Sequence, residues 1–135
     1  MPLKLNLKKE QKIIINGAVL ENKSDRSLSL ALLNDAVILR DRDILTAEEA
    51  STPAARVYYS LQCAYLFKEK RIRYVAEAKV FIEDFMVAVP SSKKICEKVL
   101  SKIEDEDFYG ALRDARKLID VEAKVLEPLP ETETD

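Results

Sequence analysis

The chain has 135 residues, 47% of them hydrophobic, which suits one soluble globular domain or a small module joined to a second one. Its 22 lysines and arginines against 24 acids give a net charge of −2, which excludes a polycation that coats nucleic acid indiscriminately. Two cysteines and no histidine exclude a disulfide framework and a four-ligand zinc site, and they fit a reducing compartment.

The first residues, MPLKLNLKKEQK, alternate polar and apolar side chains and lack the continuous apolar run of a secretory signal. No segment approaches the ~20 apolar residues of a membrane span. We therefore expect a cytoplasmic protein that has no membrane segment.

The first forty residues carry the pattern of short strands. Leucines alternate with polar residues from Leu3, and Asn16-Gly17 fits a two-residue type I′ turn between strands at 12–15 and 18–21. After a polar turn, leucines alternate again from Leu28, and a fifth strand is expected at 36–40. Residues 1–45 therefore form a small antiparallel β-meander.

Two of these strands are apolar on both faces, at residues 13–15 and 37–39. A five-stranded module rarely buries enough area to be stable alone, so it must pack on helices or on a second copy of itself. We expect a homodimer formed through this β module.

The pattern becomes helical after residue 45. A capping box begins at Thr46, and Thr52-Pro53 is a cap residue followed by proline at the first helical position. Apolar residues then recur at helical spacing in about four segments, which predicts an antiparallel helical bundle at 46–126. The predicted fold class is α+β. Residues 127–135 hold four acids and two prolines, so we expect a disordered acidic tail.

The sequence offers little for catalysis. The commonest general base is missing because the chain has no histidine, and its two isolated glycines form no phosphate-binding loop. Cys63 and Cys96 adjoin apolar helix faces, where buried thiols are commoner than nucleophiles. We expect no enzyme activity and no cofactor.

Basic residues occur at several strand ends and turns of the β module, where a small sheet brings them near one another. Such side chains hold phosphates, and arginine can read a guanine edge in single-stranded RNA. The alternative is that lysines guard exposed edge strands against aggregation. The candidate RNA-binding residues are Lys8, Lys9, Lys12, Arg26, Arg40 and Arg42.

A second candidate surface involves aromatic and basic residues of the helical part. The aromatic side chains follow helical spacing, which favours a core role over stacking on bases, and Tyr59 is the best candidate for an exposed one. The cluster FKEKRIR either ends a solvated helix or binds phosphate or an acidic partner. The candidate partner-binding residues are Tyr59, Phe67, Arg71 and Arg73.

Several segments together resemble the FlbT family of flagellar biosynthesis regulators, in order and from the first residue to about Val121. They are MPLKL, INGAV, VILRDRDIL, EEASTPAARVYY and QCAYL. The resemblance implies a bacterial cytoplasmic protein that acts on the 5′ leader of flagellin mRNA and changes its translation and lifetime. It also implies a partnership with the small helical regulator FlaF. Family members differ in whether they repress or promote flagellin synthesis, so the sign of control stays open.

A weaker similarity covers residues 1–45 alone. LKLNLKKEQKIIING and AVILRDRDIL resemble the opening and closing strands of the CsrA family, small RNA-binding β proteins that dimerise by interleaving strands. Lys8-Lys9 and Arg40 occupy the comparable places, although Arg40 is one residue farther from Ile44 than in that family and Arg42 competes with it.

Two functions follow as expectations. In the first, the β module binds the flagellin mRNA leader and alters ribosome access, with a dimer holding two sites on one leader. In the second, the helical bundle is a protein–protein adaptor for a FlaF-type regulator or for flagellin, and its effects on mRNA are indirect.

Overall fold

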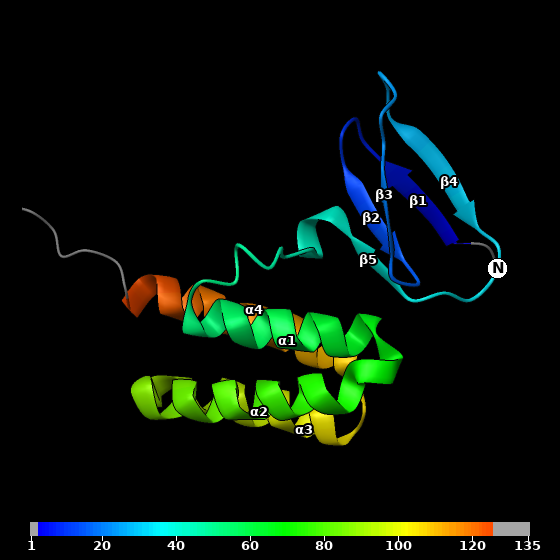
Figure 1. Cartoon of the computed structure of the whole chain (residues 1–135). Helices are drawn as coiled ribbons and strands as arrows, with labels where there is room; N and C mark the ends of the chain where they lie inside the picture. Colours follow the sequence, from blue (N-terminus) through cyan, green and yellow to red (C-terminus); the bar gives the residue numbers. More distant parts are fainter. Residues whose placement is uncertain (1–2, 126–135) are drawn as a thin grey trace, which may run out of the picture.

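The computed structural model describes residues 3–125, in which a β part precedes a helical part (Figure 1). The expected α+β class is confirmed, with five antiparallel strands ahead of the helices. The predicted acidic tail at 127–135 lies outside the described residues. The strands are β1 (Leu3–Leu7), β2 (Lys12–Ile15), β3 (Ala18–Glu21), β4 (Leu28–Leu32) and β5 (Ile38–Arg40). The helices are α1 (Pro53–Leu66), α2 (Arg71–Ala88), α3 (Lys93–Glu104) and α4 (Phe108–Val125).

The strands form two small sheets whose connectivity differs from a simple meander. β1 pairs with β4, and β2 lies between β3 and β5, so only β2 and β3 are neighbours both in sequence and in a sheet. The β1–β4 register places leucine opposite leucine at three positions and so gathers the apolar side chains of this pair on one face. The pairs are Leu3 with Leu32, Leu5 with Leu30 and Leu7 with Leu28.

The two-residue turn predicted between β2 and β3 is confirmed. Asn16 has φ 50° and Gly17 has φ 85°, and Ile15 faces Ala18 across the turn, as a type I′ hairpin requires. The side chain of Asn16 also accepts a hydrogen bond from the backbone N–H of Val37 at 2.9 Å. The turn therefore fixes the register of β2 with β3 and also ties down the chain that leads into β5.

Replacing Gly17 with valine should destabilise the fold by about 1–2 kcal/mol, because a β-branched residue is strained at positive φ. Space is not the cause, since an added Cβ would lie 3.5 Å from the ring of Phe67, an ordinary contact. Urea denaturation measures the loss. The Gly17→Asn variant is the control and should lose only a few tenths of that amount, because asparagine tolerates this backbone region.

The central strand β2 is buried on both faces within one chain. Ile13 joins Leu5 and Leu7 in a small core between the two sheets. Ile14 and Leu39 instead belong to the larger core, which the helices form. Helices on one side and the β1–β4 sheet on the other thus cover the two-sided strands. This burial does not itself require a second copy, and the expected dimer stays a prediction.

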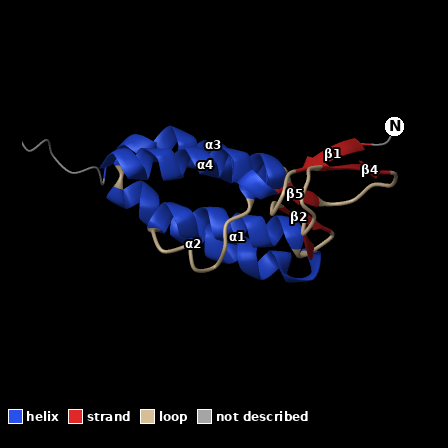
Figure 2. Cartoon of the chain, turned by 90° about the horizontal axis from the view of Figure 1, so that it is seen from above, coloured by secondary structure: helices blue, strands red, loops and turns tan. Residues whose placement is uncertain are grey.

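The helices form a bundle in which α1 packs against both α2 and α4, and α4 packs against α3. Figure 2 shows the strands at one end of this bundle.

The cap predicted at Thr52 is confirmed, since its Oγ1 accepts from the N–H of Ala55. Thr46 and Glu49 make the hydrogen bonds of a capping box, but they close a turn, because the helix begins only at Pro53. None of the helices within residues 3–125 is long and apolar enough to cross a membrane.

Side chains of α1 and α4 hold β5 and the segment that follows it. The Tyr58 hydroxyl donates to the carbonyl of Asp43 at 2.6 Å, and the Tyr65 hydroxyl donates to the carbonyl of Ile38 at 3.0 Å. Arg116 of α4 donates from Nη2 to the carbonyl of Arg42 at 2.9 Å. These bonds fix the end of the β part against the helices.

Candidate nucleic-acid interface

Four of the six predicted RNA-binding residues surround one hollow of about 210 Å³ in the β part. The hollow lies between β1, the start of β2 and the segment that follows β5. We call it the basic hollow and define it by Lys8, Lys12, Arg40 and Arg42.

Local structure explains why these residues converge. The antiparallel register sets Ile13 opposite Arg40, so the start of β2 lies beside the end of β5. The turn between β1 and β2 is closed by two hydrogen bonds between Lys8 and Gln11, at 3.0 Å and 2.9 Å. This turn keeps Lys8 close to Lys12. A short 3₁₀ helix, Asp41–Asp43, then adds Arg42 to the rim.

The charges of the basic hollow are available to a ligand. Its four basic side chains are exposed, and none of them belongs to an ion pair found within residues 3–125. The one acid that lines the hollow is Asp41, whose Oδ1 accepts from the backbone N–H of Lys12 at 2.7 Å. Four cations against one acid that is already hydrogen-bonded give the hollow a lining suited to anions.

The two other candidate RNA-binding residues do not line the hollow. Lys9 is exposed in the turn between β1 and β2, and Arg26 is exposed in the turn before β4. Sequence reasoning also missed two polar residues of the lining, Asn6 and Gln11. Asn6 could have been found, since it occupies a polar position of the alternating pattern in β1.

The four candidate partner-binding residues each have a different environment. Arg71 donates to the carbonyl of Ala64 at 2.8 Å and lies over the ring of Phe108, so it caps the end of α1. Arg73 pairs with its helix neighbour Glu77 at 3.5 Å. Phe67 lies beside Gly17 of the hairpin turn.

Tyr59, the best candidate for an exposed aromatic residue, is partly buried, whereas Phe67 is 38% exposed. Burial, followed by the neighbouring Cys63, raises the pKa of the Tyr59 hydroxyl. The partner-binding role of Tyr59, Phe67, Arg71 and Arg73 stays a prediction.

An apolar groove of about 580 Å³ lies between α2, the end of α3 and the start of α4. Its lining includes Ile72, Val75 and Phe108, and the Ile72 side chain is 88% exposed. The adaptor hypothesis predicts an apolar groove between the first two long helices, with Tyr59 or Phe67 facing solvent. The observed groove is instead formed by α2, the end of α3 and the start of α4.

The two cysteines are both buried, and burial raises the pKa of each thiol, so neither is poised as a thiolate. Within residues 3–125 no cluster of three or more carboxylates and cysteines is placed to hold a metal ion.

Comparison with known proteins identifies the family. The family model described as "Flagellar protein FlbT" matches residues 3–126. A probable flagellum biosynthesis repressor protein FlbT of Bradyrhizobium diazoefficiens is 39% identical, over 93% of this chain and 85% of its own length. A protein of the same description from Caulobacter sp. is 38% identical, over 90% of this chain and 94% of its own.

The flagellum biosynthesis repressor protein FlbT of Caulobacter vibrioides is 35% identical, over 90% of this chain and 87% of its own length. No solved structure matches the chain significantly. Because the family model and these relatives cover nearly all of the residues that build both the β part and the bundle, the chain belongs to the FlbT family, a family of regulators of flagellar synthesis.

Proposed function

We propose that this protein acts in the cytoplasm as a post-transcriptional regulator that binds the 5′ leader of flagellin mRNA and alters its translation and stability. The relatives named as flagellum biosynthesis repressors support repression as the direction of control. The basic hollow would be the RNA-binding site.

One observation carries this proposal. The fold gathers Lys8 and Lys12 of one segment with Arg40 and Arg42 of a second, distant segment around a single hollow and leaves their charges exposed. Lysines that only protect edge strands from aggregation do not need to lie close together around one hollow. Lysine and arginine hold phosphates, and arginine also reads guanine edges, which unpaired RNA bases offer.

A dimer formed through the β module would extend this function. All four residues of the outer strand β3 are exposed, so its free edge is available to a second copy. Two copies would place two basic hollows on one particle. Binding of one leader at both sites would then gain from a raised effective concentration.

Replacing Arg40 and Arg42 with alanine should weaken binding to the flagellin leader RNA at least about tenfold, because two phosphate contacts are lost. The slope of log K against log salt should fall by about 0.7 for each lost contact to a single strand. A gel-shift titration at several salt concentrations measures both quantities. The matched control is Arg56→Ala with Lys94→Ala, which removes the same charge from exposed helix positions outside both candidate surfaces. Equal effects of the two double variants would refute the site.

The alternative function is a protein–protein adaptor that grips a FlaF-type regulator, or flagellin, in the apolar groove beside α2. The exposed Ile72 and the ion pair of Lys79 with Glu104, 3.2 Å apart at the groove rim, favour an amphipathic helix there. Co-purification of a stable complex from RNase-treated extract, with no RNA affinity in the pure protein, would establish the adaptor in place of the RNA-binding regulator.

A further inference from the structure

We propose that RNA bound in the basic hollow continues onto α4 and the end of α3, where a second site holds its phosphates and stacks one base. This α4 surface consists of Lys102, Tyr109, Arg113 and Lys117. The inference rests on the proposed function, and it adds a helical contact site to the β module.

The two sites adjoin through the 3₁₀ helix after β5. Arg42 lines the basic hollow, and the next residue, Asp43, lines a second cavity of about 230 Å³ against α4. The hydrogen bond from Arg116 to the carbonyl of Arg42 fixes this junction. Tyr109, Arg113 and Lys117 line that second cavity and also a third one, of about 360 Å³, that reaches Lys102. Three neighbouring cavities thus lead from the strand ends to α3.

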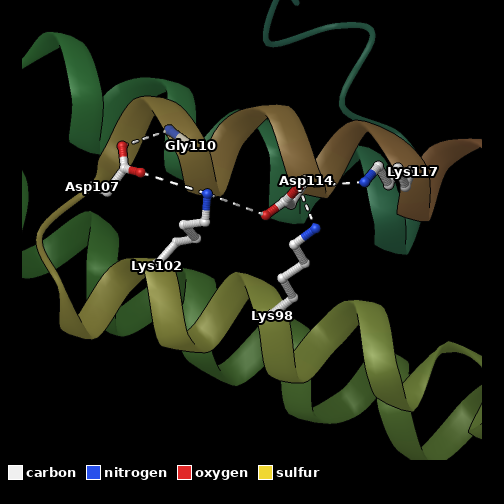
Figure 3. A network of polar contacts seen from close by, with 6 residues as sticks. All are labelled: Lys98, Lys102, Asp107, Gly110, Asp114 and Lys117. Carbon is white, nitrogen blue, oxygen red and sulfur yellow. Dashed lines mark hydrogen bonds and ion pairs between the residues drawn. The ribbon is translucent and has the colours of Figure 1, made fainter.

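A buried acid organises the lysines of the α4 surface, as Figure 3 shows. Asp114 is buried, and its Oδ2 has no hydrogen-bond partner. Its carboxylate lies 3.5 Å from Lys117, 3.9 Å from Lys102 and 4.0 Å from Lys98. One carboxylate therefore holds three ammonium groups. The excess positive charge faces solvent mainly through Lys98 and Lys117, whose side chains are more than half exposed, while Lys102 is partly buried.

A second acid of this network is already committed to the protein. Asp107 accepts from the backbone N–H of Gly110 at 2.9 Å, at the start of α4, and also lies 3.7 Å from Lys102. It therefore stabilises the N-terminus of the helix. Arg113 adds a further exposed cation beside it. Together with Lys98, which also pairs with Asp114, the α4 surface has three lysines and one arginine against two acids, so it attracts anions.

The exposed aromatic ring indicates which anion fits. Tyr109 is 39% exposed, and its ring packs on Tyr65 with centroids 5.4 Å apart. Tyr65 is itself fixed by its hydrogen bond to the carbonyl of Ile38. An aromatic ring that is fixed in position among cations is the arrangement on which single-stranded RNA stacks its bases. An acidic protein segment would need the cations but not the ring.

The test measures binding of the flagellin leader RNA by fluorescence anisotropy at several salt concentrations. Arg113→Gln with Lys117→Gln should weaken binding about tenfold and lower the salt slope by about 0.7 for each lost contact. Tyr109→Ala should weaken it about tenfold with the salt slope unchanged, whereas Tyr109→Phe should bind as the wild type does. Lys93→Gln with Lys94→Gln, at the other end of α3, is the matched charge control and should change little.

The possible failures are distinguishable. If only the Arg40 and Arg42 variant loses affinity, the proposed function stands and the α4 surface is wrong. If the wild type does not bind the RNA, both proposals fall. If the lysine control weakens binding as much as the α4 variant does, the loss of binding reflects the overall loss of positive charge and the inference is overturned. It is also overturned if poly-glutamate competes fully with the RNA and Tyr109→Ala binds normally, since the surface then serves an acidic protein.

Discussion

Replacing Asn22 with alanine is expected to cost about 3 kcal/mol of folding free energy, because its buried amide joins three segments of the β part. Asn22 is 2% exposed. Its Nδ2 donates to the carbonyls of Leu7 and Arg26, each at 2.9 Å, and its Oδ1 accepts from the N–H and the hydroxyl of Ser24. Alanine would remove the donor to the carbonyl of Leu7 at a buried position, whereas the carbonyl of Arg26 would keep the hydrogen bond from the Ser24 hydroxyl at 2.8 Å.

The loss should also disturb the basic hollow. The backbone of Asn22 exchanges hydrogen bonds with Glu10 and Gln11, in the turn that keeps Lys8 beside Lys12. Urea denaturation gives the stability, and the RNA titration gives the consequence for binding. Asn34→Ala, an exposed asparagine in the loop after β4, is the control and should be nearly neutral. A loss below about 1 kcal/mol for Asn22→Ala would show that the amide is not a structural centre.

Local signals in the sequence predicted the elements of this fold but not how the strands pair. Asn16-Gly17 and Thr52-Pro53 work through the backbone conformation of adjacent residues, and both mark element ends as expected. The pairing of β1 with β4 depends on matching leucines about 25 residues apart, and a parallel alignment of the same two strands would match their leucines equally well. Sequential pairing was the simplest assumption, and it holds only for β2 and β3.

The same distinction applies to the candidate sites. Lys8, Lys12 and Arg40 were found because each adjoins a strand end, and strand ends of a small sheet must lie close together. The α4 surface carries no such signal, because Lys102 and Lys117 belong to two helices whose rotation about their axes decides which residues meet. Asp114 in particular looks like any helix-surface acid in the sequence, yet the structure buries it.

Leu39 shows how the sheet and the helices depend on one another. It is 1% exposed, it lies opposite Ile14 in the β2–β5 pair, and both residues join the larger core with the helices. The sheet therefore packs on the bundle partly through this side chain. Leu39 also directly precedes Arg40, so its packing helps to set the position of the basic hollow.

The Leu39→Ala variant should lose about 2–5 kcal/mol of folding free energy, since it removes a fully buried side chain and leaves a cavity. Leu33→Ala, which truncates a leucine that is 76% exposed, should lose little and is the control. Urea denaturation of both variants, with Ile14→Ala and the double variant, would also give the coupling of Leu39 with Ile14, expected at about 0.5–3 kcal/mol for residues in contact. If the losses of folding free energy of the two single variants simply add in the double variant, the sheet and the bundle are not joined through this pair. If the two losses are coupled and the same variants also lose RNA affinity, the helices support the basic hollow by fixing β5. The protein then binds RNA as one folded unit.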